Sequence, residues 1–391
     1  MKKNLLNAAL LLALFFPLAS FSAEKYEFND SHIHLTNYIQ TGPSLKYFLN
    51  RMNKNGVKRS AICGLPLQLE WNVDMDGDKQ PSYYLDTNAK LYYYSAVDSI
   101  IAREYLALPR KDQKRFDPMI CGFNPADANS VNHIKQIISM YPGVFSGIGE
   151  FSIYKENVSG KIAGNSATLS SPALGRLFKL AAEIGLVVTI HCDIDSPNEG
   201  KTAQRMPRYF TAMYKLLKKY PDTTVIWAHT GLGRNVYPTS HHFECLKMIL
   251  DNCPNVMFDI SWDEVAEKVT RDEQTINKWA QLLKDYPDRF LFGTDSVAPS
   301  SNKYSREIHM YDKLWNVLPK NVQVQVKFQN YERVFNQANL RVRAWEQKHL
   351  ANLSPKINWP HQNDDSSLKK QVYSEKIKFA KPDSSENKVS L

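Results

Sequence analysis

Cysteine is scarce in this chain: the 391 residues include five, at Cys63, Cys121, Cys192, Cys245 and Cys253. No Cys-x-x-Cys spacing occurs, and the odd count leaves at least one thiol without a partner. Three of the five fall inside segments that we predict to be strands, where a free cysteine behaves as a small apolar residue. We therefore expect free, buried thiols rather than a disulfide framework.

Two nucleotide-binding signals are also missing. No run of basic residues with interleaved aromatics occurs, so nucleic-acid binding is not expected. No glycine-rich phosphate loop follows the first predicted strand, which argues against an open dinucleotide-binding sheet. The formal net charge of +9 at pH 7 is explained either by solubility or by an anionic small-molecule partner.

Residues 1–22 have the pattern of a secretory signal peptide. Lys2 and Lys3 precede the apolar stretch Leu10–Phe16, and a zone of small residues follows at 19–23. The apolar stretch is too short to span a bilayer core of about 30 Å comfortably, and no cysteine near the cleavage zone offers a lipid-anchor site. We expect cleavage after Ser22 or Ala23, export to a bacterial periplasm, and no stable membrane anchor afterwards.

Short apolar runs recur about every 30–40 residues, which is the period of a βα unit. Several are continuously apolar, as expected for a parallel sheet that is covered on both faces. Amphipathic segments lie between them, at Pro43–Asn53, Ala173–Ile184, Phe243–Leu250 and Ile276–Lys284. The eight predicted strands are Tyr26–Leu35, Val57–Pro66, Phe116–Pro125, Phe145–Ile153, Leu186–Ile194, Thr223–Leu232, Val256–Trp262 and Phe290–Ser296.

Eight such units predict a (β/α)₈ TIM barrel with a parallel eight-stranded core over residues 23–350. The long connection from Pro66 to Phe116 and the segment Asn157–Ser171 are expected to be loops at the barrel mouth, the second of them mobile. Residues 351–391 mix serine, lysine, aspartate, asparagine and proline, and are expected to form a disordered tail.

Histidine and carboxylate side chains stand at the ends of five of these predicted strands. Functional groups in a TIM barrel gather at the C-terminal ends of its strands, so residues far apart in sequence can share one ion. Four imidazoles and two carboxylates form a mixed nitrogen and oxygen ligand set, which suits Zn²⁺ and also Mn²⁺, Fe²⁺ or Co²⁺. The candidate ligands are His32, His34, Glu150, His191, His229 and Asp295. Each taken singly has an ordinary structural explanation, such as a strand or helix cap or a core histidine, but together they favour a metal site.

These motifs resemble the amidohydrolase superfamily, and its amidohydrolase-related (type 2) branch most closely. The resemblance rests on Asp-Ser-His32-Ile-His34, on the single strand-end residues His191, His229 and Asp295, and on Asn330–Phe335, which is similar to a C-terminal motif of that branch but lacks its glycine and alanine. It covers roughly residues 26–340. It implies a metal-dependent barrel, with a substrate that the motifs do not name.

The resemblance also implies roles for the ligands. His32 and His34 bind the metal, His191 and Asp295 complete the site, and His229 either binds a second ion or polarises the substrate. Many members with two ions carry a bridging lysine on the fourth strand, whereas this chain has Glu150 there. We expect Glu150 to bridge two ions, with a single ion as the alternative.

The chemistry that follows is hydrolysis of an ester, lactone, amide or phosphoester by a metal-bound hydroxide. Asp295 would take the proton of the water, and His229 would help to stabilise the oxyanion. Arg234 is a candidate clamp for a substrate carboxylate or phosphate, and Asp193 could orient a ligand or substrate; Tyr38 and Lys155 are weaker candidates. The alternatives are a decarboxylase with a single metal ion, acting on a carboxylic acid, and a non-catalytic binding protein on an inactivated barrel.

Overall fold

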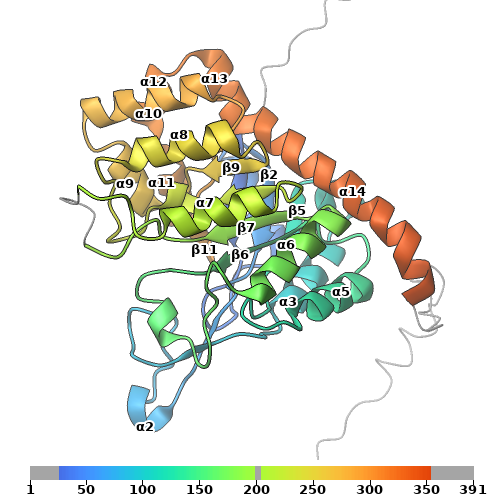
Figure 1. The fold of residues 1–391 in the computed structure, drawn as a ribbon. Coiled ribbons are helices and arrows are strands. Elements are labelled where there is room, and N and C mark those ends of the chain that lie inside the picture. Colours follow the sequence, from blue (N-terminus) through green and yellow to red (C-terminus); the bar gives the residue numbers. More distant parts are fainter. Residues whose placement is uncertain (1–25, 199–203, 354–391) are drawn as a thin grey trace, which may run out of the picture.

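The computed structural model describes residues 26–198 and 204–353 (Figure 1). Its centre is a parallel sheet with the strand order β10-β9-β8-β7-β6-β5-β2-β1-β11. All eight predicted strands are present, so the predicted (β/α)₈ architecture is confirmed. The strands are β1 (Phe28–His34), β2 (Val57–Cys63), β5 (Phe116–Ile120), β6 (Gly147–Ser152), β7 (Val187–His191), β8 (Val225–Trp227), β9 (Val256–Asp259), β10 (Phe290–Leu291) and β11 (Ser296–Val297).

The eighth strand of the barrel is divided into two short pieces, β10 and β11. β10 pairs with β9, whereas β11 pairs with β1. The residues between the two pieces also bond to β1: Ser31 N donates to Phe292 O at 3.0 Å, and Asp295 N donates to His32 O at 2.8 Å. The sheet therefore closes on itself through the segment 290–297. Asp295 lies in the gap between β10 and β11, directly before β11.

Helices surround this sheet (Figure 1), and the four predicted amphipathic segments are all helical. Local signals fix their ends: Pro172 opens α6, and Gly185 closes it in a left-handed conformation with φ 92°. The longer helices are α1 (Leu45–Lys54), α3 (Val97–Leu106), α5 (Ser130–Met140), α6 (Pro172–Ile184), α7 (Phe210–Lys219), α8 (His242–Asn252), α10 (Glu273–Asp285), α11 (Ser301–His309) and α14 (Asn330–Leu353). The shorter ones are α2 (Val73–Asp76), α4 (Arg110–Gln113), α9 (Asp263–Val269), α12 (Asp312–Val317), α13 (Lys320–Val324), η1 (Ser159–Lys161), η2 (Ala228–Gly231) and η3 (Gln325–Gln329).

The apolar core lies between the sheet and these helices. Every residue of β1, β7, β8 and β9 is buried, as a parallel sheet covered on both faces requires. All five cysteines are free and buried, which confirms the expectation of unpaired thiols. Within the residues described, no helix combines the length and the apolarity that crossing a membrane would need.

Residues 66–96, which we call the mouth insertion, form a small structure of their own. β3 (Gln68–Leu69) pairs antiparallel with β4 (Leu91–Tyr92), and a second apolar cluster that includes Tyr38 and Tyr84 packs around the pair. The predicted loop 157–171 joins this cluster: Ile162 forms a bridge with Leu91, and Lys161 Nζ donates to Thr87 O at 2.6 Å. The two segments predicted separately as mouth loops thus pack against each other.

The C-terminal motif Asn330–Phe335 lies at the start of the long helix α14. Asn330 Nδ2 donates to Pro287 O and Phe290 O, both at 2.8 Å, and Tyr331 OH donates to Asp117 Oδ2 at 2.7 Å. These bonds tie α14 to two barrel strands. The helix runs to Leu353, past the boundary expected at residue 350. The predicted signal peptide and the rest of the predicted tail lie outside the described residues.

Candidate metal centre

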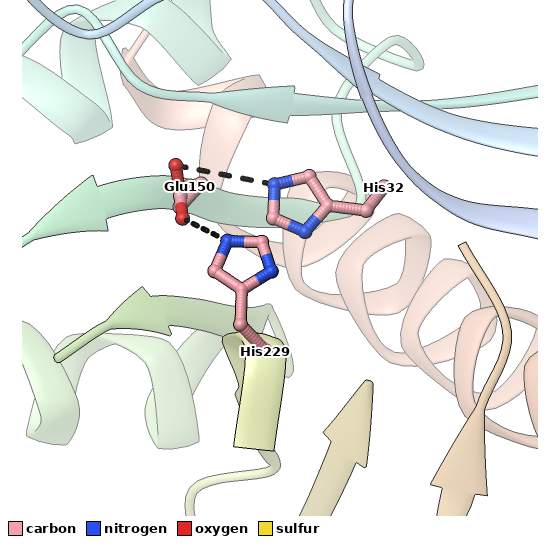
Figure 2. Close-up of side chains that lie close together, drawn as sticks. All are labelled: His32, Glu150 and His229. Carbon is pink, nitrogen blue, oxygen red and sulfur yellow. Dashed lines mark hydrogen bonds and ion pairs between the residues drawn. The ribbon is translucent and has the colours of Figure 1, made fainter. Parts of the chain in front are cut away.

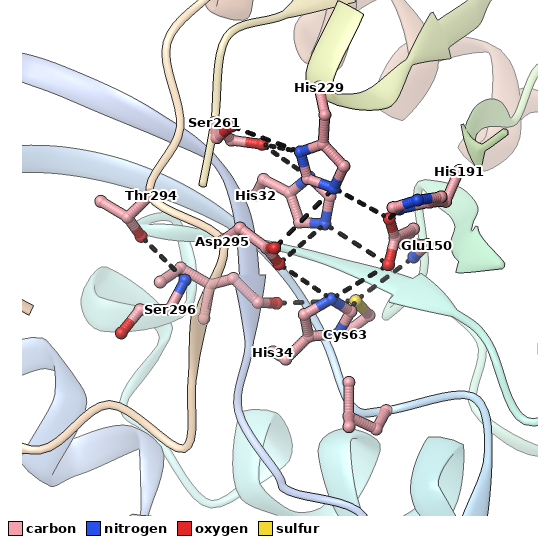
Figure 3. A network of polar contacts seen from close by, with 12 residues as sticks. His32, His34, Cys63, Glu150, His191, His229, Ser261, Thr294, Asp295 and Ser296 are labelled. Atoms are coloured by element: carbon pink, nitrogen blue, oxygen red, sulfur yellow. Dashed lines mark hydrogen bonds and ion pairs between the residues drawn. The ribbon is translucent and has the colours of Figure 1, made fainter. Parts of the chain in front are cut away.

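The structure brings the six predicted ligands together inside one end of the barrel (Figure 3). They come from β1, β6, β7, the turn η2 after β8, and the gap between β10 and β11. All are buried, with exposed fractions between 0% for His229 and 7% for Asp295. Since the C-terminal ends of parallel strands converge on the barrel axis, their placement follows from the topology alone.

Glu150 lies at the middle of the cluster, and its two oxygens face different histidines. Oε1 is 2.8 Å from His191 Nδ1 and 3.2 Å from His229 Nε2. Oε2 is 3.3 Å from His34 Nε2 and 3.9 Å from His32 Nε2. Figure 2 shows this carboxylate beside the rings of His32 and His229, with one oxygen facing each ring. The preceding Gly149 has φ 132°, and a Cβ there would collide with the carbonyl of Thr189, so only glycine lets the two strands approach this closely.

Asp295 faces the same histidines from the segment between β10 and β11. Oδ1 is 3.2 Å from His34 Nε2 and 3.5 Å from His32 Nε2, and Oδ2 is 3.7 Å from His229 Nε2. Its backbone has φ 53°, a left-handed conformation that aspartate tolerates better than most residues. The interruption between β10 and β11 therefore turns this carboxylate into the cluster.

The outer nitrogens of three rings are held by groups around the cluster. His34 Nδ1 donates to Gly64 O at 2.9 Å, His32 Nδ1 is 3.0 Å from Asp259 Oδ2, and His229 Nδ1 is 2.9 Å from Ser261 Oγ. Such bonds fix the orientation of a ring and leave its Nε2 free to bind a metal. Asp259 and Ser261 were missed as site residues, although both stand at alternate positions of the predicted strand Val256–Trp262, the spacing that puts them on one face.

His32 Nε2 and Asp295 Oδ1 lie 3.5 Å apart at the centre, and neither makes a hydrogen bond of normal geometry with the described residues. A metal ion at this position would bind both atoms directly. Ligand atoms lie within 4.8 Å of one another in two groups, His32, His34 and Asp295, and His32, Glu150 and His229. The cluster therefore fits a divalent cation that prefers imidazole and carboxylate ligands.

The protonation of the cluster follows from this arrangement of charges. Burial would lower the pKa of His32, but Asp295 and Asp259 raise it to about 9. Burial would raise the pKa of Asp295, but His32 and its neighbouring imidazoles hold it below the ordinary value. The pKa of Glu150 is likewise held well below its usual range, against burial, by Lys155 and His191. The carboxylates are therefore ionised, as metal ligands must be.

His191 and Asp193 are arranged differently from the other predicted residues. His191 is in the cluster, but its Nδ1 faces Glu150 and its Nε2 lies 2.9 Å from Asp193 Oδ1. Asp193 Oδ2 accepts a hydrogen bond from Glu156 N at 2.8 Å. Both carboxylate oxygens of Asp193 are thus bonded to other residues of the chain. Asp193 holds the His191 ring through Nε2, on the side away from Glu150.

A pocket of about 280 Å³ opens next to the cluster. Its lining includes His34 and Asp295 from the cluster, and Tyr83 and Tyr84 from the mouth insertion. The sequence candidates Tyr38, Lys155 and Arg234 also line it, together with Trp262, which the sequence did not single out. Arg234 forms an ion pair with Glu264, and its Nη2 donates to Tyr83 OH at 3.1 Å. The pocket gives a small molecule access to the buried ligand cluster.

The chain is therefore a closed (β/α)₈ barrel with a histidine and carboxylate cluster at the C-terminal ends of its strands that could hold a metal ion. The model of the amidohydrolase family matches residues 162–386, more than half of the chain, and the chain belongs to that family. This confirms the resemblance inferred from the sequence motifs. No curated protein matches the chain.

Solved structures share the fold at low sequence identity. A probable 2-pyrone-4,6-dicarboxylic acid hydrolase from Acinetobacter baumannii has 11% identity and a TM-score of 0.51, over 79% of this chain and 99% of that one. An uncharacterised TIM-barrel protein from Bordetella bronchiseptica has 13% identity and a TM-score of 0.49, over 80% and 99%. A 2,6-dihydroxybenzoate decarboxylase from Rhizobium has 13% identity and a TM-score of 0.46, over 79% and 99%. The first of these supports the fold.

Proposed function

We propose that this protein is a metal-dependent hydrolase of a small ester, lactone, amide or phosphoester. The observation that carries the proposal is the convergence of imidazole nitrogens and carboxylate oxygens within 4.8 Å of one another, in a buried cluster that borders a pocket. Ligand atoms of these types at this spacing suit a divalent metal ion. The family to which the chain belongs contributes the expectation of enzymatic activity.

The geometry around Glu150 supports a site for two ions. One ion would be held by His32, His34 and Asp295, and the other by His191 and His229, with Glu150 between them, since Oε2 faces the first group and Oε1 the second. Zn²⁺ is the ion that we expect, with Mn²⁺, Fe²⁺ or Co²⁺ as alternatives. When bound, such an ion supplies a Lewis acid and lowers the pKa of a water molecule.

The chain's own residues provide the remaining steps. Asp295 lies both in the cluster and in the pocket wall, so its carboxylate can accept the proton of the attacking water and pass it to the leaving group. His229 Nε2 lies 3.7 Å from Asp295 Oδ2, so it could stabilise negative charge on a substrate oxygen that reaches the cluster. The mouth insertion contributes Tyr83 and Tyr84 to the pocket wall.

A second reaction, decarboxylation of a carboxylic acid, is supported by a different observation. The two groups of possible ligands share His32, which can bind only one ion at a time. A second ion would therefore need another ligand, and His191 could provide it only if its Nε2 were released from Asp193. A single ion would leave His229 free to polarise the substrate. The number of bound ions therefore separates the two reactions.

The test is a metal analysis followed by activity assays. We expect two equivalents of a divalent transition metal in the wild type and one or fewer in Glu150→Gln. Loss of metal is also expected in His32→Ala combined with His34→Ala, with a folded barrel by circular dichroism, whereas His309→Ala, an exposed histidine, serves as the control. One equivalent in both the wild type and Glu150→Gln would refute the bridge, and full metal content in the double variant would refute the site.

Turnover is then measured on a panel of esters, lactones, amides and phosphoesters, and of carboxylic acids for release of carbon dioxide. Hydrolysis that is lost with the metal supports the main proposal, and carbon dioxide release supports the second.

We also propose that the protein acts after export, most simply in a bacterial periplasm. The support is the sequence of residues 1–22 alone. Fusion of these residues to a reporter that is active only outside the cytoplasm tests the proposal, with a version in which Lys2 and Lys3 are replaced by glutamate as the control.

A further inference from the structure

The same tripeptide, Ile-Cys-Gly, stands at the ends of two neighbouring strands. Residues 62–64 include the end of β2, and residues 120–122 include the end of β5. β2 and β5 pair in parallel, so both ends point toward the same face of the barrel as the ligand cluster. The repeat brings Cys63 and Cys121 to one place in the fold.

Both glycines of the repeat pack against the start of α3. A Cβ on Gly64 would collide with the Val97 side chain, and a Cβ on Gly122 would lie 3.2 Å from the same side chain and 2.9 Å from Asp98 Oδ2. Asp98 also accepts hydrogen bonds from Cys121 N at 2.8 Å and from Gly122 N at 3.0 Å. Only residues without a side chain allow this approach, and α3 thereby holds the two strand ends together.

The two thiols share one buried space. The Cys63 and Cys121 side chains contact each other. Cys121 Sγ donates to Gly64 O at 3.3 Å, and His34 Nδ1 donates to the same oxygen at 2.9 Å. A pair of reduced thiols in contact is the arrangement from which a disulfide forms when an oxidant is available.

Cys63 also contacts the ligand cluster, as Figure 3 shows. Its Sγ accepts a hydrogen bond from Glu150 N at 3.3 Å and lies 3.4 Å from His34 Nδ1. No step of the proposed hydrolysis uses this thiol. Groups that hold metal ligands from outside tune the affinity for the metal, so a chemical change at Cys63 reaches the metal centre.

A small oxidant that enters the mouth pocket meets Cys63 before Cys121. His34 lines the pocket, and its ring is a direct neighbour of Cys63 Sγ. Leu65, two residues after Cys63, lines the pocket as well. Cys121 is fully buried and lies toward α3, where its backbone is bonded to Asp98. The first sulfur to react is therefore that of Cys63.

We propose that Cys63 and Cys121 form a reversible disulfide when the protein encounters a peroxide, and that this bond weakens the metal centre. The second part of the inference rests on the proposed function, because it concerns the same cluster. The first part does not, because forming the disulfide requires no metal. An exported protein would meet oxidising conditions, under which disulfides form and persist.

The oxidation uses one molecule of hydrogen peroxide. Cys63 Sγ attacks one oxygen, the O–O bond breaks, the thiol proton leaves with the departing oxygen as water, and Cys63 becomes a sulfenic acid. Cys121 Sγ then attacks the Cys63 sulfur, the S–O bond breaks, and the proton of Cys121 leaves with that oxygen as a second water. The two sulfurs lose two electrons, which the peroxide gains. The new bond draws Cys63 Sγ toward β5 and away from Glu150 N.

Peptide mapping of the full mature protein tests the disulfide. The zinc-loaded protein is treated with hydrogen peroxide, its remaining thiols are alkylated, and it is digested without reductant. Trypsin releases Cys63 in residues 60–79 and Cys121 in residues 116–135, each with a single cysteine, so a linked pair is unambiguous. We expect this linked pair in the oxidised protein and its loss after dithiothreitol.

Variants test the order of the two steps. In Cys121→Ser the sulfenic acid has no thiol to react with, so dimedone, a reagent for sulfenic acids, should label Cys63. In Cys63→Ser dimedone should label Cys121 far less. Cys253→Ser, at the end of α8, removes a buried thiol distant from the pair and serves as the matched control, with the same linked peptide as the wild type.

Competition with a chelator then measures the affinity for zinc alone. We expect the oxidised wild type and Cys253→Ser to bind zinc about 10- to 100-fold more weakly than the reduced proteins, the usual effect of losing a group that holds a ligand. Dithiothreitol, removed before the measurement, should restore the affinity.

Absence of the linked peptide after both hydrogen peroxide and diamide would overturn the inference, and this result requires no variant to fold. A linked peptide with unchanged zinc affinity would overturn the effect on the metal centre. The two proposals fail separately: a protein that forms the disulfide but hydrolyses nothing in the panel refutes the hydrolase and leaves the thiol pair supported.

Discussion

The two ends of the barrel contain the same kinds of residue in opposite states. At one end, Asp117 in β5 is 2% exposed and fully bonded: it accepts from Arg59 Nη2 at 2.8 and 2.9 Å, from Tyr331 OH at 2.7 Å and from Asn339 Nδ2 at 2.7 Å. At the other end, Asp295 is also buried, but it faces the imidazoles of the cluster at 3.2 to 3.7 Å, and its Oδ1 makes no hydrogen bond of normal geometry with the described residues.

This difference separates a group that stabilises the fold from one that is available for chemistry. A buried carboxylate with all of its partners in place joins distant segments, here β5 and α14. A buried carboxylate that faces imidazoles at longer distances beside a pocket can also bind a metal ion or accept a proton. In a TIM barrel the first kind belongs to the N-terminal face of the strands and the second to the C-terminal face. Substitutions at the two ends should therefore affect different properties.

The largest effect is expected for Asp295→Asn. The amide keeps an oxygen for the metal but cannot accept a proton, so turnover should fall by about 10²- to 10⁴-fold, the usual contribution of a general base. The melting temperature should fall by less than it does for Asp117→Asn, because Asp295 loses ion pairs with His32 and His34 but no short hydrogen bonds. The measurement is kcat on the best substrate of the panel, together with the melting temperature and the metal content. Turnover near the wild-type value would exclude Asp295 as the proton acceptor.

Asp117→Asn should show the reverse pattern. Replacing one partner of a buried ion pair leaves the Arg59 charge uncompensated, and such changes cost about 3–5 kcal/mol. Urea unfolding measures this loss in the free energy of unfolding, while kcat per folded molecule should be unchanged. Lys58→Met, which breaks a partly exposed pair with Glu332, is the control, with an expected cost below about 1 kcal/mol. A loss of turnover without a loss of stability would contradict the division between the two ends.

The sequence was sufficient to predict the barrel and its ligands because both depend on strand periodicity. Parallel strands cover both faces, so each appears as an apolar run, and their ends must meet at one mouth. His191 and His229 follow such a run directly, and His32 and His34 lie at the end of the first predicted strand. The assignment of residues to the cluster required no knowledge of how the side chains are bonded.

What the sequence did not predict depends on contacts between distant segments. The run Phe290–Ser296 has the pattern of one strand, and the break that turns Asp295 inward arises from bonds to both neighbouring strands. Asp259 was not predicted as a site residue, because in the sequence a carboxylate that bonds to His32 cannot be distinguished from any other polar residue of a strand. The packing of the mouth insertion against residues 157–171 and the position of Trp262 have no local signal of periodicity or turn residues.

Asp259→Asn tests how far the cluster depends on residues that do not touch the metal. Its carboxylate holds His32 Nδ1 at 3.0 Å and accepts from His229 N at 2.8 Å. The amide would weaken the orientation of both rings, and changes of this kind typically reduce metal affinity by about 10- to 100-fold. Competition with a chelator measures the affinity. An affinity equal to that of the wild type would show that the ligands alone fix the site.

The smallest effect is expected for the pH dependence of stability at His242. This histidine is buried in α8, away from both ends of the barrel, and so can be compared with the buried histidines of the cluster. Its ring packs against Phe243 and Trp279, and neither ring nitrogen has a hydrogen-bond partner within residues 26–198 and 204–353. Burial lowers the pKa of His242 to about 3, whereas the carboxylates around His32 raise the pKa of that residue to about 9. Equal burial thus gives opposite shifts, and the neighbouring charges decide the sign.

The pH dependence of stability follows from the His242 shift. Because its pKa is lower in the folded state, the unfolded chain binds a proton more readily once the pH falls below about 6.5, and the free energy of unfolding decreases by at most about 1.4 kcal/mol per pH unit. His242→Leu removes this titration and keeps an apolar side chain in the core. Urea unfolding at several pH values between 7 and 4.5 should therefore give a shallower slope for His242→Leu than for the wild type, with His309→Ala as the exposed control. Identical slopes for His242→Leu and the wild type would mean that the ring gains a proton without unfolding, and that its burial does not keep it neutral.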